Sequence, residues 1–522
     1  MRMKRWTAFW LGILILAVPL VSCSAKKPST SDETRTQAQT QQGEESMPLE
    51  ETVDPNTVPD IPEGTDFGGK MIRILIRRNE KFCQEWGSNE IPDATATELD
   101  QQVYLRNELV QQTLNVNFHF TQATVADGND FNQVVSKAAS LDNSFDIISN
   151  KEYNSVADLV LGHYINLYDL ENLNLSKSYW NQTFISAGTV NGNLYTVVGD
   201  VNLSVYMCMF CMFFNIDKCE AQGEGWSAAD LFDTVLNGDW TWEELARYVK
   251  AADVNSDINA ATPLYALYSH SYSHAFDGLL HAFNLQLSMT DPDDGSHSLV
   301  AGSAWSKMQQ AANKIYELYH DANNPAALDK TGYDPLSPLT GNTEYNLFDA
   351  GQALFALEGV SDSQKRKTAN LADEYGLLPL PKYDSSQEEY YTGVHDAHNV
   401  ISVMNGNRNY AAVGAVLELL SAYSYEGVRP YYVETLVKKR YLDDPQSAKV
   451  LDLVLDGAKW DFVAIYASRI MNSAENGQSP VTRLWRAGVE RNELVTRYAQ
   501  YEQGWNEAFR AFDSSEYFQK QD

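Results

Sequence analysis

The chain has 522 residues, of which 44% are hydrophobic and 21% are charged, so it is long enough to fold around more than one hydrophobic core. Its 39 basic and 70 acidic residues give a formal net charge of −31 at pH 7. A chain this acidic is poorly suited to binding nucleic acid or an anionic lipid surface, and we expect neither as a partner.

The first residues carry the pattern of a secretory signal. A basic start, Met1 to Arg5, precedes a mostly apolar run from Trp6 to Val21. This order is typical of a signal peptide, and the apolar run turns polar too soon for a spanning helix. The run ends in Leu20-Val-Ser-Cys23, which resembles the lipobox of bacterial lipoproteins. That resemblance implies cleavage of residues 1–22 and a diacylglycerol anchor on Cys23. It places the protein at the extracellular face of the cell membrane, or in the periplasm of a two-membrane envelope.

Residues 24–66 are rich in Ser, Thr, Gln, Glu and Pro and have almost no large apolar side chains. Such a segment cannot bury a core, so we predict a disordered tether from Cys23 to residue 66. The folded body is then expected to span residues 67–522.

The start of the body alternates short β-rich runs with helical patterns. We predict strands at 71–76, 116–120 and 145–149, and helices at 95–110 and 131–139, the first opened by a Thr95/Glu98 capping box. This alternation indicates βαβ crossovers and a mainly parallel sheet. Ligands of such sheets bind beyond the carboxyl ends of the strands, so Asn150 and Tyr153 are candidate ligand-binding residues, although a plain turn explains them equally well.

The rest of the body has a long apolar run and a helix-rich end. We interpret residues 203–214 as a buried strand, and Thr241 with Glu244 as the cap of another helix. Further helices are predicted at 305–319, 348–358, 411–423, 447–455 and 481–512, with strands at 377–380 and 399–404.

Two clusters carry possible metal or redox chemistry. Cys208 and Cys211 have C-x-x-C spacing, but they lie inside the apolar run, which favours core residues over a redox or zinc pair. His270, His274, Asp277 and His281 share one face of a possible helix and could hold a metal ion. Hydroxyl binding by part of that stretch, or an ordinary surface, are the alternatives.

No G-x-S-x-G or H-E-x-x-H motif occurs, so the sequence predicts neither an enzyme nor a cofactor. A glycoside-active enzyme stays open as an alternative, because a chain with 70 acidic residues always offers pairs of carboxylates.

An ordered series of short motifs resembles one family along nearly the whole body. The pieces are Phe67-Gly-Gly-Lys70, Arg106-Asn107, Phe145-Asp-Ile-Ile148, Asn166-Leu-Tyr-Asp-Leu170, Tyr179-Trp-Asn181, Asn191-Gly-Asn-Leu-Tyr195, Phe213-Phe-Asn215, Gly238-Asp-Trp-Thr-Trp242, Gly351-Gln-Ala-Leu-Phe355, Leu378-Pro-Leu-Pro-Lys382 and Pro430 to Asp444. Together they resemble the family 1 extracellular solute-binding proteins of ABC importers, in the branch that binds maltose and other oligosaccharides. Tyr179 in place of a Trp and Asn193 in place of a Lys depart from the family pattern, which puts the identity of the ligand in doubt more than the fold.

The resemblance implies a periplasmic-binding-protein-like α/β fold. It consists of two α/β lobes with mainly parallel sheets and a hinge, which close on a solute, in a monomer that serves ABC permease subunits. We expect one lobe at roughly 68–185 and 345–400, and the other at roughly 186–344 and 401–522.

A carbohydrate needs aromatic plates for its C–H faces and carboxylates or amides for its hydroxyls. The candidate plates are Trp180, Tyr206, Trp240 and Tyr391, and the candidate hydroxyl partners are Glu152, His274, Asp277 and Glu358. Core packing is the alternative role for each aromatic residue, and a solvated face is the alternative for each acid.

Overall fold

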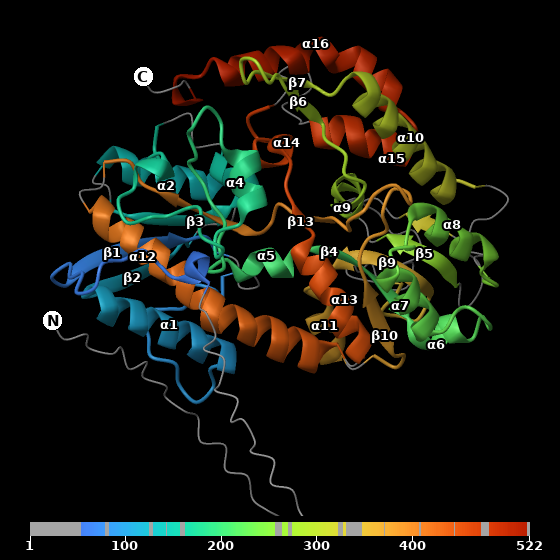
Figure 1. The fold of residues 1–522 in the computed structure, drawn as a ribbon, viewed down its shortest axis with the longest axis horizontal. Coiled ribbons are helices and arrows are strands. Elements are labelled where there is room, and N and C mark those ends of the chain that lie inside the picture. Colours follow the sequence, from blue (N-terminus) through green and yellow to red (C-terminus); the bar gives the residue numbers. More distant parts are fainter. Residues whose placement is uncertain are drawn as a thin grey trace, which may run out of the picture. The chain divides into compact units, whose positions relative to one another are not determined.

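The structure is a computed structural model that describes residues 54–518, except for 79–82, 125–128, 142–143, 157–161, 256–263, 270–273, 322–326, 330–346, 370, 407–408, 443 and 471–479 (Figure 1). The predicted signal peptide, Cys23 and the first part of the predicted tether lie outside these residues. None of the described helices is both long enough and apolar enough to cross a membrane.

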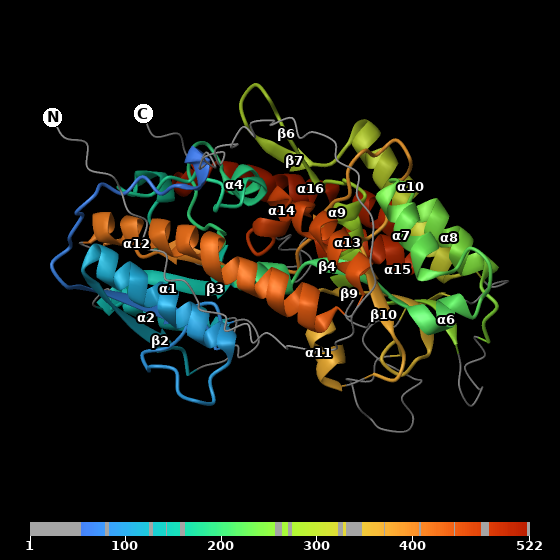
Figure 2. The ribbon, with the colours of Figure 1, turned by 60° about the horizontal axis from the view of Figure 1, so that its bottom comes forward.

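The first sheet contains the strands predicted near the start of the body. Its order is β12 (Asn399–Val403), β3 (Ile147–Lys151), β1 (Lys70–Ile76) and β2 (Val116–Gln122). Strand β1 runs parallel to β2 and β3, and β12 is antiparallel to β3. The parallel pairs are joined through α1 (Glu98–Leu114) and α2 (Asn129–Leu141), which confirms the βαβ interpretation. Figure 2 shows α12 (Tyr410–Tyr423) alongside α1.

The second sheet is mixed. Its order is β10 (Tyr375–Leu378), β4 (Phe210–Asn215), β9 (Ala353–Gly359), β5 (Tyr265–Ser269) and β8 (Ala327–Asp329). Strand β5 is parallel to β8 and β9, whereas β4 is antiparallel to β9 and β10. Two α/β units, each built on an open sheet, therefore form the body, as the sequence predicted.

The other described elements surround these sheets (Figure 1). The helices are α3 (Glu152–Ser155), α4 (Gln182–Gly188), α5 (Leu203–Met207), α6 (Ile216–Glu220), α7 (Ala228–Leu236), α8 (Trp242–Ala251), α9 (His274–Ala282), α10 (Gly302–Tyr319), α11 (Asp362–Ala369), α13 (Pro445–Asp456), α14 (Phe462–Ile465), α15 (Ala487–Arg491) and α16 (Leu494–Asp513). Short 3-10 turns are η1 (Pro55–Thr57), η3 (Leu167–Asp169) and η8 (Glu516–Phe518), and π-helical segments are η4 (Ser424–Val428), η5 (Tyr431–Tyr441) and η7 (Val481–Arg486). Two further strand pairs are β6 (Ser288–Thr290) with β7 (His297–Leu299), and β11 (Thr392–Gly393) with β13 (Ala458–Lys459).

Two sequence-based assignments of secondary structure are wrong in type. The helix predicted at 348–358 is strand β9, which is central in its sheet and buried except at its last residue. A short apolar run buried on both faces has no period that separates strand from helix. The strand predicted at 203–214 begins instead as helix α5 and becomes strand β4 after Cys208.

Two assignments differ in detail. The cap of α1 is a Thr97/Asp100 capping box, two residues beyond the predicted Thr95/Glu98 pair that fits the same pattern. The helix predicted at 481–512 is divided into η7, α15 and α16, because Asn492 adopts a left-handed conformation with φ of 56°.

The residue ranges that build each sheet differ from the ranges predicted for the two lobes. Strands β9 and β10 lie within 345–400 but belong to the second sheet, with β4 and β5. Most of β12 and all of α12 lie after residue 400, yet they pack with the first sheet and its helix α1. The resemblance therefore located the crossings between lobes too early in the C-terminal half, because none of its motifs marks a sheet boundary.

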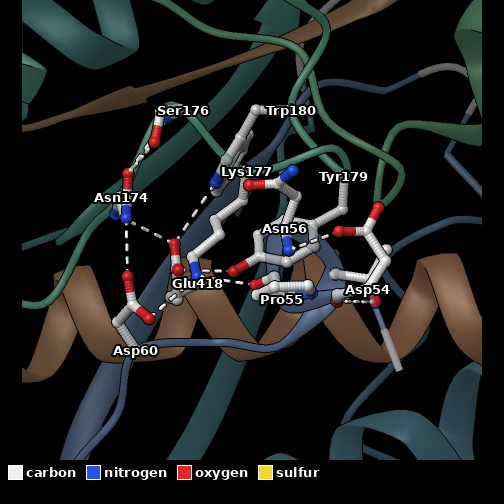
Figure 3. Close-up of polar contacts among 11 residues, drawn as sticks. Asp54, Pro55, Asn56, Asp60, Asn174, Ser176, Lys177, Tyr179, Trp180 and Glu418 are labelled. Atoms are coloured by element: carbon white, nitrogen blue, oxygen red, sulfur yellow. Dashed lines mark hydrogen bonds and ion pairs between the residues drawn. The ribbon is translucent and has the colours of Figure 1, made fainter. Parts of the chain in front are cut away.

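The last part of the predicted tether is fastened to the body. We call residues 54–60 the N-terminal strap. Lys177, which is 7% exposed, donates from Nζ to the Pro55 carbonyl at 3.2 Å and to Asp60 Oδ1 at 2.8 Å (Figure 3). Asn174 also donates to Asp60, at 2.6 Å, and the Ser178 amide donates to the Asn56 carbonyl. These bonds order a segment that has too few apolar residues to order itself.

The loop that holds the strap rests on a buried carboxylate of α12. Glu418 accepts from the Asn174 amide at 3.1 Å and from the Trp180 indole at 3.2 Å, and the Tyr179 hydroxyl also donates to it (Figure 3). Burial raises the pKa of Glu418, and these donors oppose the rise. The strap is thus connected through one loop to the helix that covers α1.

We predict that Asp60→Ala releases the strap while the body stays folded. The Asp60 side chain is largely exposed, so its ion pair with Lys177 contributes at most about 1 kcal/mol to global stability. Hydrogen exchange of residues 54–60 should rise at least about tenfold, because the change removes both the ion pair and the Asn174 bond. Glu63→Ala, an exposed change in the same segment, is the control, and equal exchange in the two variants would contradict the assignment.

Candidate ligand-binding site

Three segments connect the two sheets. The first is α5, which leads into β4, and the second is the stretch 394–398 between β11 and β12. The third is the helical run 410–441, in which α12 packs on α1 of the first sheet and η5 packs on α11 and α13 beside the second. Any change in the angle between the sheets has to bend these segments.

One buried residue, Glu85, gathers all three connections through its carboxylate and its backbone carbonyl. Glu85 Oε2 accepts from the backbone amide of Ser204 in the first connection at 2.8 Å. Its Oε1 accepts from the Asn399 side chain, at the end of the second, at 2.6 Å. The Glu85 carbonyl accepts from Arg106 at 2.8 Å, and the same guanidinium donates to the hydroxyl of Ser424 in the third, at 3.0 Å.

The network is closed by a second arginine. Arg77, at the end of β1, donates from Nε to Asn399 Oδ1 at 2.5 Å and also donates to the Ala397 carbonyl. All of the side chains of this hub, which are those of Arg77, Glu85, Arg106, Ser204, Asn399 and Ser424, are buried. Buried polar groups are costly unless they are bonded, so the hub fixes the first-sheet ends of the three connections together.

A pocket of about 880 Å³ lies where elements of the two sheets meet. One wall comes from α4, whose Ile185 belongs to the core cluster beside the first sheet. The opposite wall comes from residues 389–391 and the end of α13, which packs on β10 of the second sheet. Figure 1 shows α4, β13 and α14 as neighbours at this junction.

The pocket lining combines aromatic rings with hydroxyl and amide groups. The rings are those of His297, Tyr390, Tyr391, Trp460 and Phe462, and the uncharged polar side chains are those of Gln182, Thr183, Ser186, Thr189, Gln286, Ser288 and Thr290. The charged side chains are those of Glu389, Asp456, Lys459 and Asp461. Flat rings beside hydroxyl and amide groups suit a ligand that has apolar faces and many hydroxyls.

Local bonds hold this lining in place. Asp461 caps α14 by accepting from the Val463 amide at 2.8 Å, and burial raises the pKa of Asp461 to about 6. The His297 ring stacks on Phe462 with a centroid separation of 3.8 Å, and its Nδ1 lies 2.6 Å from Asp513 of α16. The C-terminal helix therefore positions one wall of the pocket.

Behind Trp460 lies a group of buried polar atoms without hydrogen-bond partners among the described residues. They are Trp460 Nε1, His398 Nε2 and Glu152 Oε1. The His398 ring lies 5.7 Å from that of Trp460, and its Nδ1 donates to the His395 carbonyl at 3.0 Å and lies 3.6 Å from Glu152 Oε2. Burial lowers the pKa of His398 to about 4 and raises that of Glu152 well above its usual range. Burial therefore disfavours the charged form of both side chains.

One of the sequence-predicted residues lines the pocket, and three others lie outside its lining, in β3 and α3. Tyr391 lines the pocket, half-buried, with Lys459 Nζ 4.3 Å from its ring centroid. Glu152 Oε1 is one of the buried polar atoms near Trp460 that have no hydrogen-bond partner among the described residues. Asn150 is buried in β3 and donates to Asn132 at 3.2 Å, and Tyr153 is half-buried in α3.

Five other predicted residues do not line the pocket either. Trp180 and Trp240 are buried in the cores of the two α/β units, where their indoles donate to Glu418 and to the Pro379 carbonyl. Tyr206 donates to Asp200. Glu358 and Asp277 form ion pairs with Arg366 and Arg486. Each polar group here has a partner within the fold, which the one-dimensional pattern could not show.

The predicted metal face is interrupted. His270 lies outside the described residues, and nothing is described of the His274 side chain. Asp277 is bound by Arg486, and burial lowers the pKa of His281 to about 4. In the described part of the chain, no three His, Cys, Asp or Glu side chains gather as a metal site requires. Cys208 and Cys211 are buried, as predicted, and burial raises the pKa of Cys211, which is the opposite of a reactive thiol.

Sequence reasoning missed most of the pocket wall. Its key members, Glu389, Asp456, Lys459 and Trp460, come from segments without a family motif, as does His398, whose ring lies beside that of Trp460. The run Gly457-Ala-Lys-Trp-Asp461, which places a Trp beside charged residues just after a helix, was the available signal.

We predict that Glu85 makes stability fall as pH rises. Burial raises the pKa of Glu85 from 4.5 to about 7, so the folded chain binds this proton more tightly than the unfolded chain does. Its contribution is complete below pH 4.5 and is lost as pH rises to about 7, a loss on the order of 3 kcal/mol. Glu85→Gln should flatten this slope in urea unfolding across that range.

The exposed change Glu90→Gln is the control for this measurement and should leave the slope as in the wild type. A Glu85→Gln variant with the wild-type pH slope would show that another group titrates.

The fold has many solved counterparts, although no protein-family model and no curated protein sequence matches the chain. The galacto-N-biose/lacto-N-biose I-binding protein of an ABC transporter from Bifidobacterium longum, solved with lacto-N-biose, is 11% identical over 86% of this chain and 98% of its own, with a TM-score of 0.51. An extracellular solute-binding protein family 1 from Alicyclobacillus acidocaldarius is 12% identical over 85% and 99%, with a TM-score of 0.50. A cyclo/maltodextrin-binding protein complexed with maltotetraose is 11% identical over 86% and 99%, with a TM-score of 0.50. The chain therefore has the two-lobed α/β fold of the extracellular solute-binding proteins.

Proposed function

We propose that this protein is the lipid-anchored receptor of an ABC importer, which captures a carbohydrate in the pocket between its lobes and delivers it to the membrane permease. The observation that carries the proposal is a pocket of about 880 Å³ at the junction of the two α/β units, lined by aromatic rings and hydroxyl groups. Proteins with the same fold have been solved with lacto-N-biose and maltotetraose, which are ligands of the same chemistry.

In this proposal capture is a closure of the two lobes and breaks no covalent bond. The hub around Glu85 holds the first-sheet ends of the three connections, so bending is left to the parts of these connections nearer the second sheet. Closure would bring α4 toward residues 389–391 and surround the ligand from both sides. The solved counterparts described above are binding proteins, which is in keeping with a receptor.

We predict that Tyr391→Ala and Trp460→Phe each weaken carbohydrate binding by about tenfold or more. The first removes a ring from the pocket wall. The second keeps a ring but removes an indole N–H that has no hydrogen-bond partner within the described part of the chain. A thermal-shift screen of oligosaccharides identifies the ligand, and calorimetry of each variant measures the loss. Tyr316→Ala, an aromatic change outside this pocket, is the control and should bind normally.

The same screen separates the alternatives. If the protein releases reducing ends from the sugar that stabilises it, it is a glycoside-active enzyme and not a receptor. Stabilisation by no sugar at all would reject the carbohydrate ligand.

We predict that Cys23→Ala detaches the protein from the membrane without changing its ligand affinity. Cys23 closes the sequence that resembles a lipobox, and a lipid on this residue would keep the receptor at high local concentration beside its permease. In cell fractionation, the variant should be found in the soluble fraction, whereas the wild type should be found in the membrane fraction. Calorimetry on the purified variant should give the wild-type affinity, and continued membrane attachment would refute the anchor.

A further inference from the structure

The charged side chains around the pocket are mainly acidic. Glu389 and Asp456 are both exposed on the wall contributed by the second α/β unit, and Asp461 lies buried beside them. Lys459 is the only Lys or Arg among the described lining residues. The whole chain carries a formal charge of −31, so its long-range field also opposes an approaching anion.

The one lysine of the lining already has partners. Its Nζ donates to Asn284 Oδ1 and lies over the Tyr391 ring, with 4.3 Å to the centroid. Burial lowers the pKa of Lys459, so the charged form is less favoured there than on an open surface. An anionic ligand would have to displace these contacts before the ammonium could pair with it.

The buried polar atoms at and beside Trp460 also suit uncharged groups. Trp460 Nε1 is a donor, and His398 Nε2 is an acceptor because Nδ1 of that ring donates to the His395 carbonyl. Burial raises the pKa of Glu152 and so favours its protonated form, which can both donate and accept. A hydroxyl group, which also does both, complements this set, whereas an ion would lose its hydration without gaining a counter-charge.

We propose that the pocket takes uncharged oligosaccharides and discriminates against oligosaccharides that carry carboxylate, sulfate or phosphate groups, through Glu389 and Asp456 at its wall. The inference rests on the proposed function and adds the charge class of the ligand. Neutral sugars form the same aromatic and hydroxyl contacts without bringing a second negative charge toward these acids.

The test uses the full body with glycan pairs that differ in charge but not in linkage, such as β-1,4-linked mannotetraose and its tetramannuronate counterpart, together with maltose-, xylose- and galactose-based pairs. Calorimetry at low and high salt should give at least about tenfold tighter binding of the neutral member, with a smaller gap at high salt. The double variant Glu389→Gln/Asp456→Asn should narrow that gap. The double variant Glu63→Gln/Asp169→Asn has the same net charge but is changed at exposed sites outside the pocket, and it should leave the gap unchanged.

Each outcome decides a different point. Equal or tighter binding of the acidic members would overturn this inference and leave the carbohydrate receptor standing. Binding of neither member of any pair would reject the proposed function and this inference with it. If the affinity difference between neutral and acidic glycans narrows equally in both double variants, the discrimination comes from the net charge of the whole protein and not from Glu389 and Asp456.

Discussion

The buried Glu85 carboxylate is the constraint on which the arrangement of the body depends. The carboxylate binds Ser204 and Asn399 directly, and the Glu85 backbone carbonyl accepts from Arg106, which also donates to Ser424. Three segments far apart in sequence thus share one anchoring residue. Its desolvation is expensive, which is why burial raises its pKa to about 7 and why every side chain around it is bonded. The cost of burying polar groups is thus concentrated at the one point where the three connections between the sheets are held together.

The polar atoms at Trp460, a residue of the pocket lining, and those of its buried neighbours differ from the hub in lacking partners among the described residues. Trp460 Nε1, His398 Nε2 and Glu152 Oε1 are buried without a hydrogen bond among the described residues, whereas the hub is fully bonded. Buried polar groups without hydrogen bonds lower the stability of the free protein. A ligand that forms hydrogen bonds with them gains binding free energy. The hub therefore stabilises the protein without a ligand. The buried polar atoms near Trp460 are suited to hydrogen bonds with a bound ligand.

The N-terminal strap links the proposed anchor to the first α/β unit. Residues 54–60 have the composition of a flexible linker, yet Lys177 and Asn174 hold them, and Glu418 of α12 supports the holding loop. Composition describes what a segment can do alone, and here the body supplies the partners that the segment lacks. The strap is thus attached to the same α/β unit that contains the hub.

The sequence by itself determined the strand and helix order of the first sheet and the acidic charge, because alternation of period and residue composition are local properties. It also placed Glu152 and Tyr391 near the site, since one follows a strand end and the other is a ring in a polar segment. Tertiary structure decided that Trp180 and Trp240 are core residues and that 353–359 is a strand. It also decided that Trp460, Asp456 and Glu389 line one pocket together with residues of α4. Burial and partnership depend on residues hundreds of positions apart, which no local pattern contains.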